Sequence, residues 1–382
     1  MRILIGGDIN PSQRDLEYFI NGKSNTIFGN TSEIISSSDL IIANLETPLI
    51  NTKSPINKSG PIHSAPQEAI AGIKQSGINF LNLSNNHILD HGYAGLESTI
   101  KTLDRAGINY GGAGMDGEKS SEPKKLKIKN QRIAILSYCE HEFSVSRNNY
   151  PGANGLDIID FLDKIKHLKE HNFYTILLFH GGKEHYMLPT PNQKKTCEFF
   201  IRYGADIVVC QHSHISGVIN EIDSKHIIYG QGNFVFDPYP KSSEWLYKGL
   251  LIELIIKENQ LEKIDYHPII HNSFKDKNNI GINLMQDDEK NVFLNNIKSV
   301  SKEFIDDPEM VYKSWEQFSV KHKNLFYSIF NGNGKILRKI NQYLPYLNFT
   351  YSKESKTILK NIITCETHLE MARTILDKDL DV

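Results

Sequence analysis

The sequence predicts an α/β protein built as a layered sandwich, followed by a helical extension. Up to about residue 205, short apolar runs of strand length alternate with amphipathic segments of helical spacing, and strands then follow one another in series. Several of the apolar runs end in clusters of polar side chains. Ligands of such folds bind beyond the strand ends, so these clusters form the candidate functional site.

The first third of the chain shows the alternation clearly. Gly77 and Gly107 each follow an amphipathic segment, at the position just past a helix where glycine is favoured. Residues 51–66 are rich in Lys, Asn, Ser, Gly and Pro and are expected to form an exposed loop. Strands are expected at residues 3–5, 40–43, 79–83 and 108–110, and helices at residues 67–75 and 94–106, with an earlier helix ending over residues 33–38.

The middle of the chain continues this pattern and then changes to strands. Asn130 and Gln131 separate two strand-like runs, which is typical of a hairpin. Strands are expected at residues 126–129, 132–138, 174–179, 207–210, 227–229, 250–257 and 261–267, and helices at residues 157–171 and 191–203.

Beyond about residue 270 the composition changes, and Lys, Asn and Glu become frequent. Helical periodicity is present over residues 287–304, 310–324, 325–343 and 355–377. We therefore divide the chain into a layered domain at residues 1–270 and a helical extension at residues 271–382. The extension suits internal packing or a homo-oligomer contact better than a substrate-recognition lid.

Composition and charge exclude several classes of protein. The chain is 39% hydrophobic and 23% charged with a net charge of −2, so neither nucleic acid nor an anionic membrane is expected as a partner. Its four cysteines show no paired spacing, which argues against a disulfide framework or a zinc ribbon. A signal-peptide pattern and an 18-residue apolar run are both missing from the sequence. We therefore expect a cytoplasmic protein without stable membrane insertion.

The polar clusters contain the donors of a metal site. The central one, residues 81–92, reads LNLSNNHILDHG, and others follow strand-like runs at residues 6–10, 44–46, 180–185 and 211–214. Carboxylate, amide and imidazole groups without cysteine favour one or two ions of Mn, Fe or Zn. In the His-x-His pair, alternate positions of an extended segment face the same way. The candidate metal ligands are Asp8, Glu46, Asn86, His180, His212 and His214.

Other residues of these clusters have possible roles in catalysis or substrate binding. His87, beside a candidate amide ligand, is free to act as a general acid. Asp90 could orient His87 or contact the substrate. Glu184 and His185 could contact substrate or solvent.

Eight motifs in the right order over residues 1–267 resemble the CapA-type (poly-γ-glutamate capsule) branch of the calcineurin-like metallophosphatase superfamily. The resemblance implies a four-layer α/β/β/α sandwich, with the six ligands above around the metal centre and His87 as the catalytic histidine. The motifs are GD at residues 7–8, NLETPL at 44–49, LSNNHILDHG at 83–92, AGINYGGAG at 106–114, HGGKEH at 180–185, TPNQ at 190–193, GADIVVCQHSH at 204–214 and GNFVFD at 232–237.

The chain also departs from the superfamily pattern. Asn10 stands where metallophosphatases usually carry a histidine, and Glu46 replaces their bridging aspartate. Gln211 stands where glycine is common, and residues 63–65 replace an aromatic-and-arginine segment. We also expect no membrane anchor of the kind usual in capsule proteins. These changes weaken the first metal position, so one metal, or none, remains an alternative to two.

Three functions follow from this pattern. The first is a metal-dependent hydrolase or transferase that cleaves a phosphoester or a peptide or poly-glutamate-type amide with a metal-activated hydroxide, His87 protonating the leaving group. The second, which the resemblance implies because some relatives of this branch look like peptide-modifying epimerases, is metal-independent acid/base chemistry carried by Asp8 with His212 or His214. The third is a non-catalytic polymer-assembly factor. For either enzyme the expected substrate is peptide-like or phosphorylated.

Overall fold

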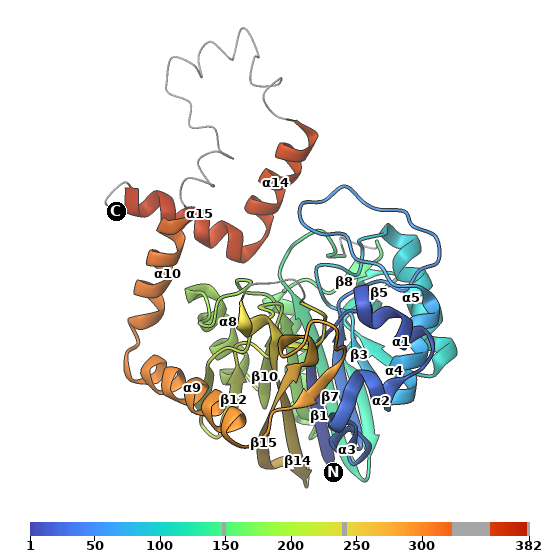
Figure 1. Cartoon of the computed structure of the whole chain (residues 1–382). Coiled ribbons are helices and arrows are strands. Elements are labelled where there is room, and N and C mark those ends of the chain that lie inside the picture. The colour runs from blue at the N-terminus through green and yellow to red at the C-terminus, as the bar shows by residue number, and fades with distance from the viewer. Residues whose placement is uncertain (147–149, 239–242, 323–351, 380–382) are drawn as a thin grey trace.

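The computed structural model describes residues 1–146, 150–238, 243–322 and 352–379 (Figure 1). Its larger sheet has eight strands in the order β16-β15-β14-β1-β2-β3-β4, with β13 also paired to β1. β1 to β4 run parallel, so their carboxyl ends meet at one edge. The strands are β1 (Arg2–Ile9), β2 (Leu40–Leu45), β3 (Phe80–Asn82), β4 (Asn109–Gly111), β13 (Asn233–Val235), β14 (Lys248–Lys257), β15 (Gln260–His271) and β16 (Ile282–Leu284).

The second sheet has six strands in the order β11-β12-β10-β9-β7-β6. Its central strands β7, β9, β10 and β12 are also parallel. The hairpin predicted around Asn130 is formed by β6 and β7. The strands are β6 (Lys124–Ile128), β7 (Gln131–Cys139), β9 (Tyr174–His180), β10 (Ile207–Gln211), β11 (Ile219–Ile222) and β12 (Lys225–Ile228); β5 (Ala113–Gly114) and β8 (Gly152–Ala153) form a separate short ladder.

The two sheets pack face to face between two layers of helices. On β1, Ile3 and Ile5 enter the core between the sheets, whereas Leu4 enters the core beneath the helices, as the alternation of a strand requires. This confirms the predicted four-layer α/β/β/α sandwich. The larger sheet is covered by α1 (Leu16–Ile20), α2 (Ser24–Phe28), α3 (Ser32–Ser36), α4 (Ile70–Ser76) and α5 (Gly92–Ala106), and the second by α7 (Ile158–Glu170) and α8 (Pro191–Arg202), while α6 (Gly117–Ser121) lies beside β5.

The helix ends follow local chemistry. Gly77 and Gly107 end α4 and α5 in left-handed conformations, with φ of 97° and 70°. Asp157 caps α7 by accepting hydrogen bonds from the backbone N–H groups of residues 159 and 160. Thr190 caps α8, where Pro191 occupies the first turn. Capping side chains, a first-turn proline and C-terminal glycines thus determine where these helices begin and end.

The C-terminal region contains α9 (Asp287–Asp306), α10 (Met310–Lys321), α14 (Lys353–Thr364) and α15 (Glu366–Asp379). The single helix predicted over residues 355–377 is wrong, because the buried Cys365 has an extended backbone that divides it. The helix predicted over residues 325–343 lies outside the described residues. β16 lies beyond the predicted domain boundary at residue 270, yet it pairs with β15 in the larger sheet.

We call α14 and α15 the C-terminal helix pair; Figure 1 shows it beyond the end of the sandwich that lies opposite the N-terminus. Trp315 of α10 is 2% exposed and belongs to a small core with residues of both helices. The ring of Tyr186, which follows β9, packs 4.7 Å from that of Phe318. Asn57 donates a 2.6 Å hydrogen bond to Thr357 of α14. The pair is therefore docked on loops of the sandwich.

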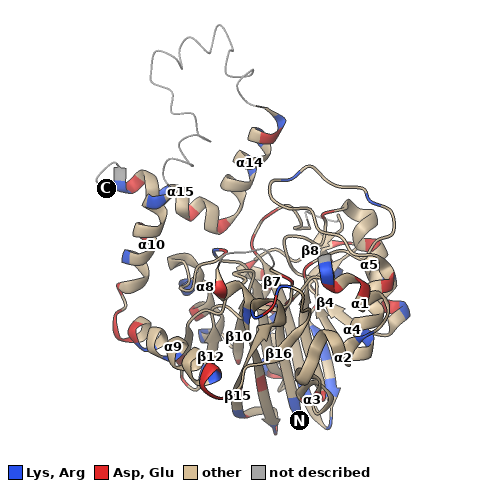
Figure 2. Ribbon diagram, viewed as in Figure 1, with Lys and Arg blue, Asp and Glu red and all other residues tan. Residues whose placement is uncertain are grey.

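Charged residues of both signs are mixed over the molecule, and no cysteine forms a disulfide in the described residues. In the view of Figure 2, Lys and Arg are interspersed with Asp and Glu over the ribbon. All four cysteines are buried thiols. In the part of the chain that the structure describes, no helix combines the length and the apolar character needed to cross a membrane.

Docking of the C-terminal helix pair is expected to weaken at alkaline pH. Glu140 is 4% exposed and accepts hydrogen bonds from Thr367 Oγ1 at 2.7 Å and Cys365 Sγ at 3.3 Å. Burial, together with the nearby Glu366, raises the pKa of Glu140 to about 8. A carboxyl whose pKa is higher in the folded state stabilises the fold most below its unfolded pKa and loses that contribution as pH rises through about 8.

We therefore expect urea denaturation to give a lower free energy of unfolding at pH 9 than at pH 6. Glu140→Gln should flatten this difference because its amide does not titrate. An unchanged pH dependence in that variant would assign the effect to other groups.

Candidate metal centre and catalytic site

The parallel strands of both sheets deliver polar side chains to one region. Asp8 lies near the end of β1, Glu46 directly follows β2, and Asn86 lies in the turn after β3. The second sheet contributes its side chains from the ends of two neighbouring strands, His180 from β9 and His212 and His214 from just after β10. The structure therefore brings together all six predicted metal ligands.

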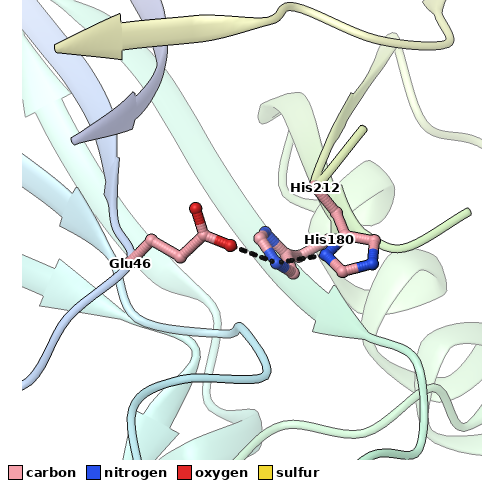
Figure 3. Close-up of side chains that lie close together, drawn as sticks. All are labelled: Glu46, His180 and His212. Carbon is pink, nitrogen blue, oxygen red and sulfur yellow. Dashed lines mark hydrogen bonds and ion pairs between the residues drawn. The ribbon is translucent and has the colours of Figure 1, made fainter. Parts of the chain in front are cut away.

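One group of possible ligands surrounds His180 (Figure 3). Its Nε2 atom lies 3.3 Å from Glu46 Oε1, 3.1 Å from His212 Nδ1 and 3.1 Å from Asn86 Oδ1. Each of these four residues is at least nine-tenths buried. Two imidazoles, a carboxylate and an amide oxygen are sufficient donors for a divalent ion.

A second group lies on the other side of Glu46. His214 Nδ1 is 3.5 Å from Asp8 Oδ2 and 3.9 Å from Glu46 Oε2. Within each group, Glu46, His180 and His212 or Asp8, Glu46 and His214, the possible ligand atoms lie within 4.8 Å of one another. Glu46 belongs to both groups, with one carboxylate oxygen toward each, as a bridging ligand requires.

The burial and hydrogen bonding of the Glu46 side chain indicate whether these residues are suited to bind a metal ion. Its side chain is fully buried, and among the described residues neither carboxylate oxygen accepts a hydrogen bond. Burial raises the pKa of Glu46 well above its usual value, and the Asp8 charge raises it further. A buried carboxylate whose oxygens accept no hydrogen bond is costly, and a divalent cation between the two groups would stabilise it. The residues present therefore fit one or two such ions.

The histidines differ in their protonation. Burial lowers the pKa of His180 to about 4 and that of His212 well below its usual value, so both rings are neutral near pH 7, as metal ligands must be. Burial also acts to lower the pKa of His214, but the carboxylates of Glu46 and Asp8 outweigh it and raise the value to about 9. Without a metal ion, a proton on His214 thus provides the positive charge that these carboxylates favour; an ion bound by His214 would displace that proton and supply the charge instead.

The backbone around the His-x-His pair is strained. His212 has φ of 93° and His214 has φ of 57°, in a region that residues other than glycine rarely occupy. Such conformations cost about 1–3 kcal/mol each and cluster at functional sites. His214 is also held by a 2.9 Å contact between its Nδ1 atom and Asn233 Oδ1.

A network of buried amides supports the site, and the sequence-based ligand list did not include it. Asn44 donates a 2.8 Å hydrogen bond to Asp8 Oδ1, which orients that carboxylate. Asn82 donates to Asn44 Oδ1 at 3.1 Å and to Gln211 Oε1 at 3.2 Å, joining strand ends of the two sheets. The signal for these residues was their place at the end of buried strands, where an amide needs a partner.

Asp90 contacts the Nδ1 side of the His87 ring and is itself paired with Lys58. Asp90 Oδ2 lies 2.7 Å from His87 Nδ1, and Asp90 Oδ1 lies 2.6 Å from Lys58 Nζ. Burial, then the Lys58 charge, lower the pKa of His87 well below its usual value. The side chain of Asp90 is fully buried, a position that suits orienting His87. The alternative substrate-binding role of Asp90 stays a prediction.

The prediction that residues 51–66 form an exposed loop is wrong at Lys58. Residues 51–66 are mostly exposed as expected, but the side chain of Lys58 is only 2% exposed. Its neighbour His63 packs its ring 4.2 Å from the ring of His87 and donates a backbone hydrogen bond to Asp90. Lysines on loops are usually solvated, so no sequence signal distinguished this one.

Glu184 and His185 lie toward the outside of the centre. Burial opposes ionisation of Glu184, but the nearby His214 and Lys183 charges lower its pKa. His185 is exposed, and its ring lies 6.2 Å from that of His214. Their predicted contacts with substrate remain predictions.

Removing Asp90 is expected to destabilise the fold strongly. Asp90→Ala leaves the Lys58 ammonium buried without its carboxylate, a loss of about 3–5 kcal/mol in the free energy of unfolding. Urea denaturation measures the effect. Glu97→Ala is the control, because its pair with Lys101 on α5 is 48% and 64% exposed and contributes about 0.5 kcal/mol or less. Equal losses in the two variants would contradict the buried pairing.

Comparison with known proteins now defines the family. The family model described as bacterial capsule synthesis protein PGA_cap matches residues 2–238. The chain belongs to the PGA_cap family. This confirms the CapA-type resemblance of the sequence motifs. Every predicted ligand and His87 lie within the matched range.

Two curated relatives are similar in sequence to part of this chain. The capsule biosynthesis protein CapA of Bacillus anthracis is 28% identical over 60% of this chain and 58% of its own length. The PGA biosynthesis protein CapA of Bacillus subtilis (strain 168) is 26% identical over 64% of this chain and 65% of its own. The chain thus spans less than two thirds of either relative. A solved structure of a hypothetical protein from Thermus thermophilus matches 70% of this chain and 98% of its own at 12% identity, with a TM-score of 0.46.

Proposed function

We propose that this PGA_cap-family chain is a metal-dependent hydrolase or transferase that acts on a phosphoester or a peptide-type amide. The observation that carries the proposal is Glu46, a buried carboxylate between two groups of imidazole and oxygen donors. Neither of its oxygens accepts a hydrogen bond from the described residues, whereas a shared pair of ions would engage both.

Each residue of the site has a role in this proposal. Asp8 and His214 would hold one ion, Asn86, His180 and His212 the other, and Glu46 both. Bound ions of this kind supply a nucleophile near neutral pH and neutralise charge on the reacting group.

His87 would act through Nε2, because its Nδ1 atom is engaged by Asp90. Since burial and Lys58 keep the ring neutral, Nε2 would first take up the proton that the attacking water loses and would then pass it to the leaving group. The two charged groups behind it, Asp90 and Lys58, fix the orientation of the ring.

The relatives support a polymer as the substrate class. Two of them are named for capsule and PGA biosynthesis, so a peptide-type polymer of a capsule is the first substrate to test. A non-catalytic role in polymer assembly predicts the same association with capsule synthesis but no turnover.

A second candidate function has its own observation. Asp8 Oδ2 lies 3.5 Å from His214 Nδ1, and Asn10 supplies no imidazole beside them. Asp8 and His214 could then move a proton at the Cα atom of a peptide residue without any metal, which is epimerase-like chemistry.

The deciding experiment is elemental analysis of protein purified without chelator, beside an Asp8→Ala/His214→Ala variant. One or two equivalents of Mn, Fe or Zn, reduced in the variant, with cleavage of phosphoester or peptide substrates that a chelator abolishes, support the first function. Metal-free protein that incorporates solvent deuterium into a peptide supports the second instead. Neither cleavage nor exchange, with or without added metal, supports the assembly role.

A further inference from the structure

A cavity of about 670 Å³ lies beside the candidate catalytic site. It is partly open to solvent and is lined by the loop of residues 51–66, the start of α5, the segment after β7 and α14 of the C-terminal helix pair. Cavities of this size hold small ligands or short segments of polymer. None of the six candidate metal ligands lines it, so it is a separate subsite.

The cavity and the catalytic site share a wall. Glu142 lines the cavity, and its Oε1 atom lies 4.0 Å from His212 Nε2. Phe143, another lining residue, has its ring 5.7 Å from Lys58 Nζ, the ammonium that pairs with Asp90. A substrate reacting at the metal centre could therefore place an adjoining group in the cavity.

The lining is mainly aromatic and aliphatic. Tyr93 and Tyr150 stack with ring centroids 6.1 Å apart and planes 14° apart, although both rings are about half exposed. Other apolar members are Ile56, Leu89, Phe143 and Val145. Half-exposed stacked tyrosines offer a rigid apolar surface with polar ends, which is common in recognition sites.

Charge argues against a polyanion in this cavity. Its charged lining residues are Lys360 and Glu142, one of each sign. A chain of acidic residues would require an excess of cations here.

One lining group requires a hydrogen-bond donor. Asn361 of α14 is 6% exposed, and its Oδ1 atom has no partner among the described residues. A buried amide oxygen without a donor is costly; this oxygen is not itself exposed to the cavity, and a peptide N–H would satisfy it once the Asn361 amide turned toward the ligand. This second observation points to an amide-containing ligand.

We propose that this cavity binds an aromatic or branched aliphatic side chain of a peptide-like substrate, with Asn361 accepting a hydrogen bond from an amide of that substrate. The assignment rests on the proposed function and selects within its substrate classes: it favours peptides that are not uniformly acidic over the poly-glutamate-type polymer for which the relatives are named. α14 forms one wall, so the C-terminal helix pair determines which residue is accepted.

Two small probes test the cavity directly. The dissociation constants of N-acetyl-phenylalanine methylamide and N-acetyl-glutamate methylamide are measured by ligand titration in NMR spectra of the full chain. We expect the phenylalanine probe to bind at least 10-fold more tightly. Equal binding, or tighter binding of the glutamate probe, overturns the proposal.

Substitutions on α14 and α5 test whether the phenylalanine probe binds in this cavity. Thr364 lines the cavity, whereas its neighbour Ile363 is 57% exposed and does not. Thr364→Trp should fill the cavity and weaken the phenylalanine probe at least 10-fold, while Ile363→Trp should leave binding unchanged. Tyr93→Ala, at a half-exposed position outside the hydrophobic cores, should weaken the probe about 3- to 10-fold, the range expected for loss of one aromatic contact. Unchanged binding in both Thr364→Trp and Tyr93→Ala overturns the proposal.

The binding assay requires neither metal nor turnover. Selective binding of the phenylalanine probe in a protein that shows no hydrolysis supports the cavity assignment and counts against the proposed function. Metal-dependent hydrolysis without selective binding supports the proposed function and overturns the cavity assignment.

Discussion

Replacing Glu46 with glutamine is expected to weaken metal binding at both positions at once. Glu46 is common to the two groups of possible ligands, and a neutral amide of the same shape cannot balance the charge of two divalent ions. Changes in the residues that only support ligands lower metal affinity about 10- to 100-fold, so loss of a shared ligand should exceed 100-fold. Metal content after dialysis against a buffered ion concentration measures the effect.

The same variant should be more stable than the wild-type protein when both lack metal. Glu46→Gln removes a buried carboxylate that has no hydrogen-bond partner among the described residues, and such groups cost about 1–3 kcal/mol or more. Glu253→Gln is the matched control, because Glu253 is a buried carboxylate of β14 that contacts Arg2 and His267. It should keep its metal and lose stability. A Glu46→Gln protein that binds metal as the wild type does would show that Glu46 is not a shared ligand.

Replacing His87 with alanine is expected to reduce turnover while metal content stays unchanged. A positioned general acid contributes about 10²- to 10⁴-fold to the rate, and His87 is the histidine that Asp90 and Lys58 hold beside the centre. The rate constant is measured on two phosphoesters or amides that differ in their leaving group. The defect should be small for 4-nitrophenolate, which leaves without a proton, and large for an alkoxide or amine.

Asp90→Asn distinguishes the role of Asp90 in orienting His87 from the role of His87 in transferring a proton. It keeps the shape of the side chain but loses the charge that orients His87, so the rate should fall less than in His87→Ala, by about 10- to 100-fold. If His87→Ala instead lost metal, or slowed both leaving groups equally, His87 would not be the general acid.

The ligand positions could be predicted because each depends on a short stretch of sequence. Asp8, Glu46, His180 and His212 each lie at, or next to, the end of a buried strand, and parallel strands bring such ends together. The apolar runs alone were therefore enough to bring these side chains to one region. The four-layer architecture required the family resemblance as well, because strand order depends on pairing between distant residues.

The parts that could not be predicted depend on contacts between distant segments. Lys58 is buried because Asp90 lies beside it, and the break at Cys365 accompanies a contact with Glu140 more than 200 residues earlier. Helical spacing continues through Cys365 without interruption, so periodicity gave no sign of the break. The pocket beside Glu142 likewise requires α14 and a loop from the first 66 residues.

The position of β1 has a consequence for how the chain folds. β1 precedes the other described strands in the chain, yet among the described residues one of its edges is covered by β13 and β14 alone, which end at residue 257. Until those residues leave the ribosome, a central, strongly apolar strand keeps an open edge, which is where nascent chains associate with one another or with chaperones. We expect slow folding dominated by this long-range pairing, with completion of the larger sheet as its late step.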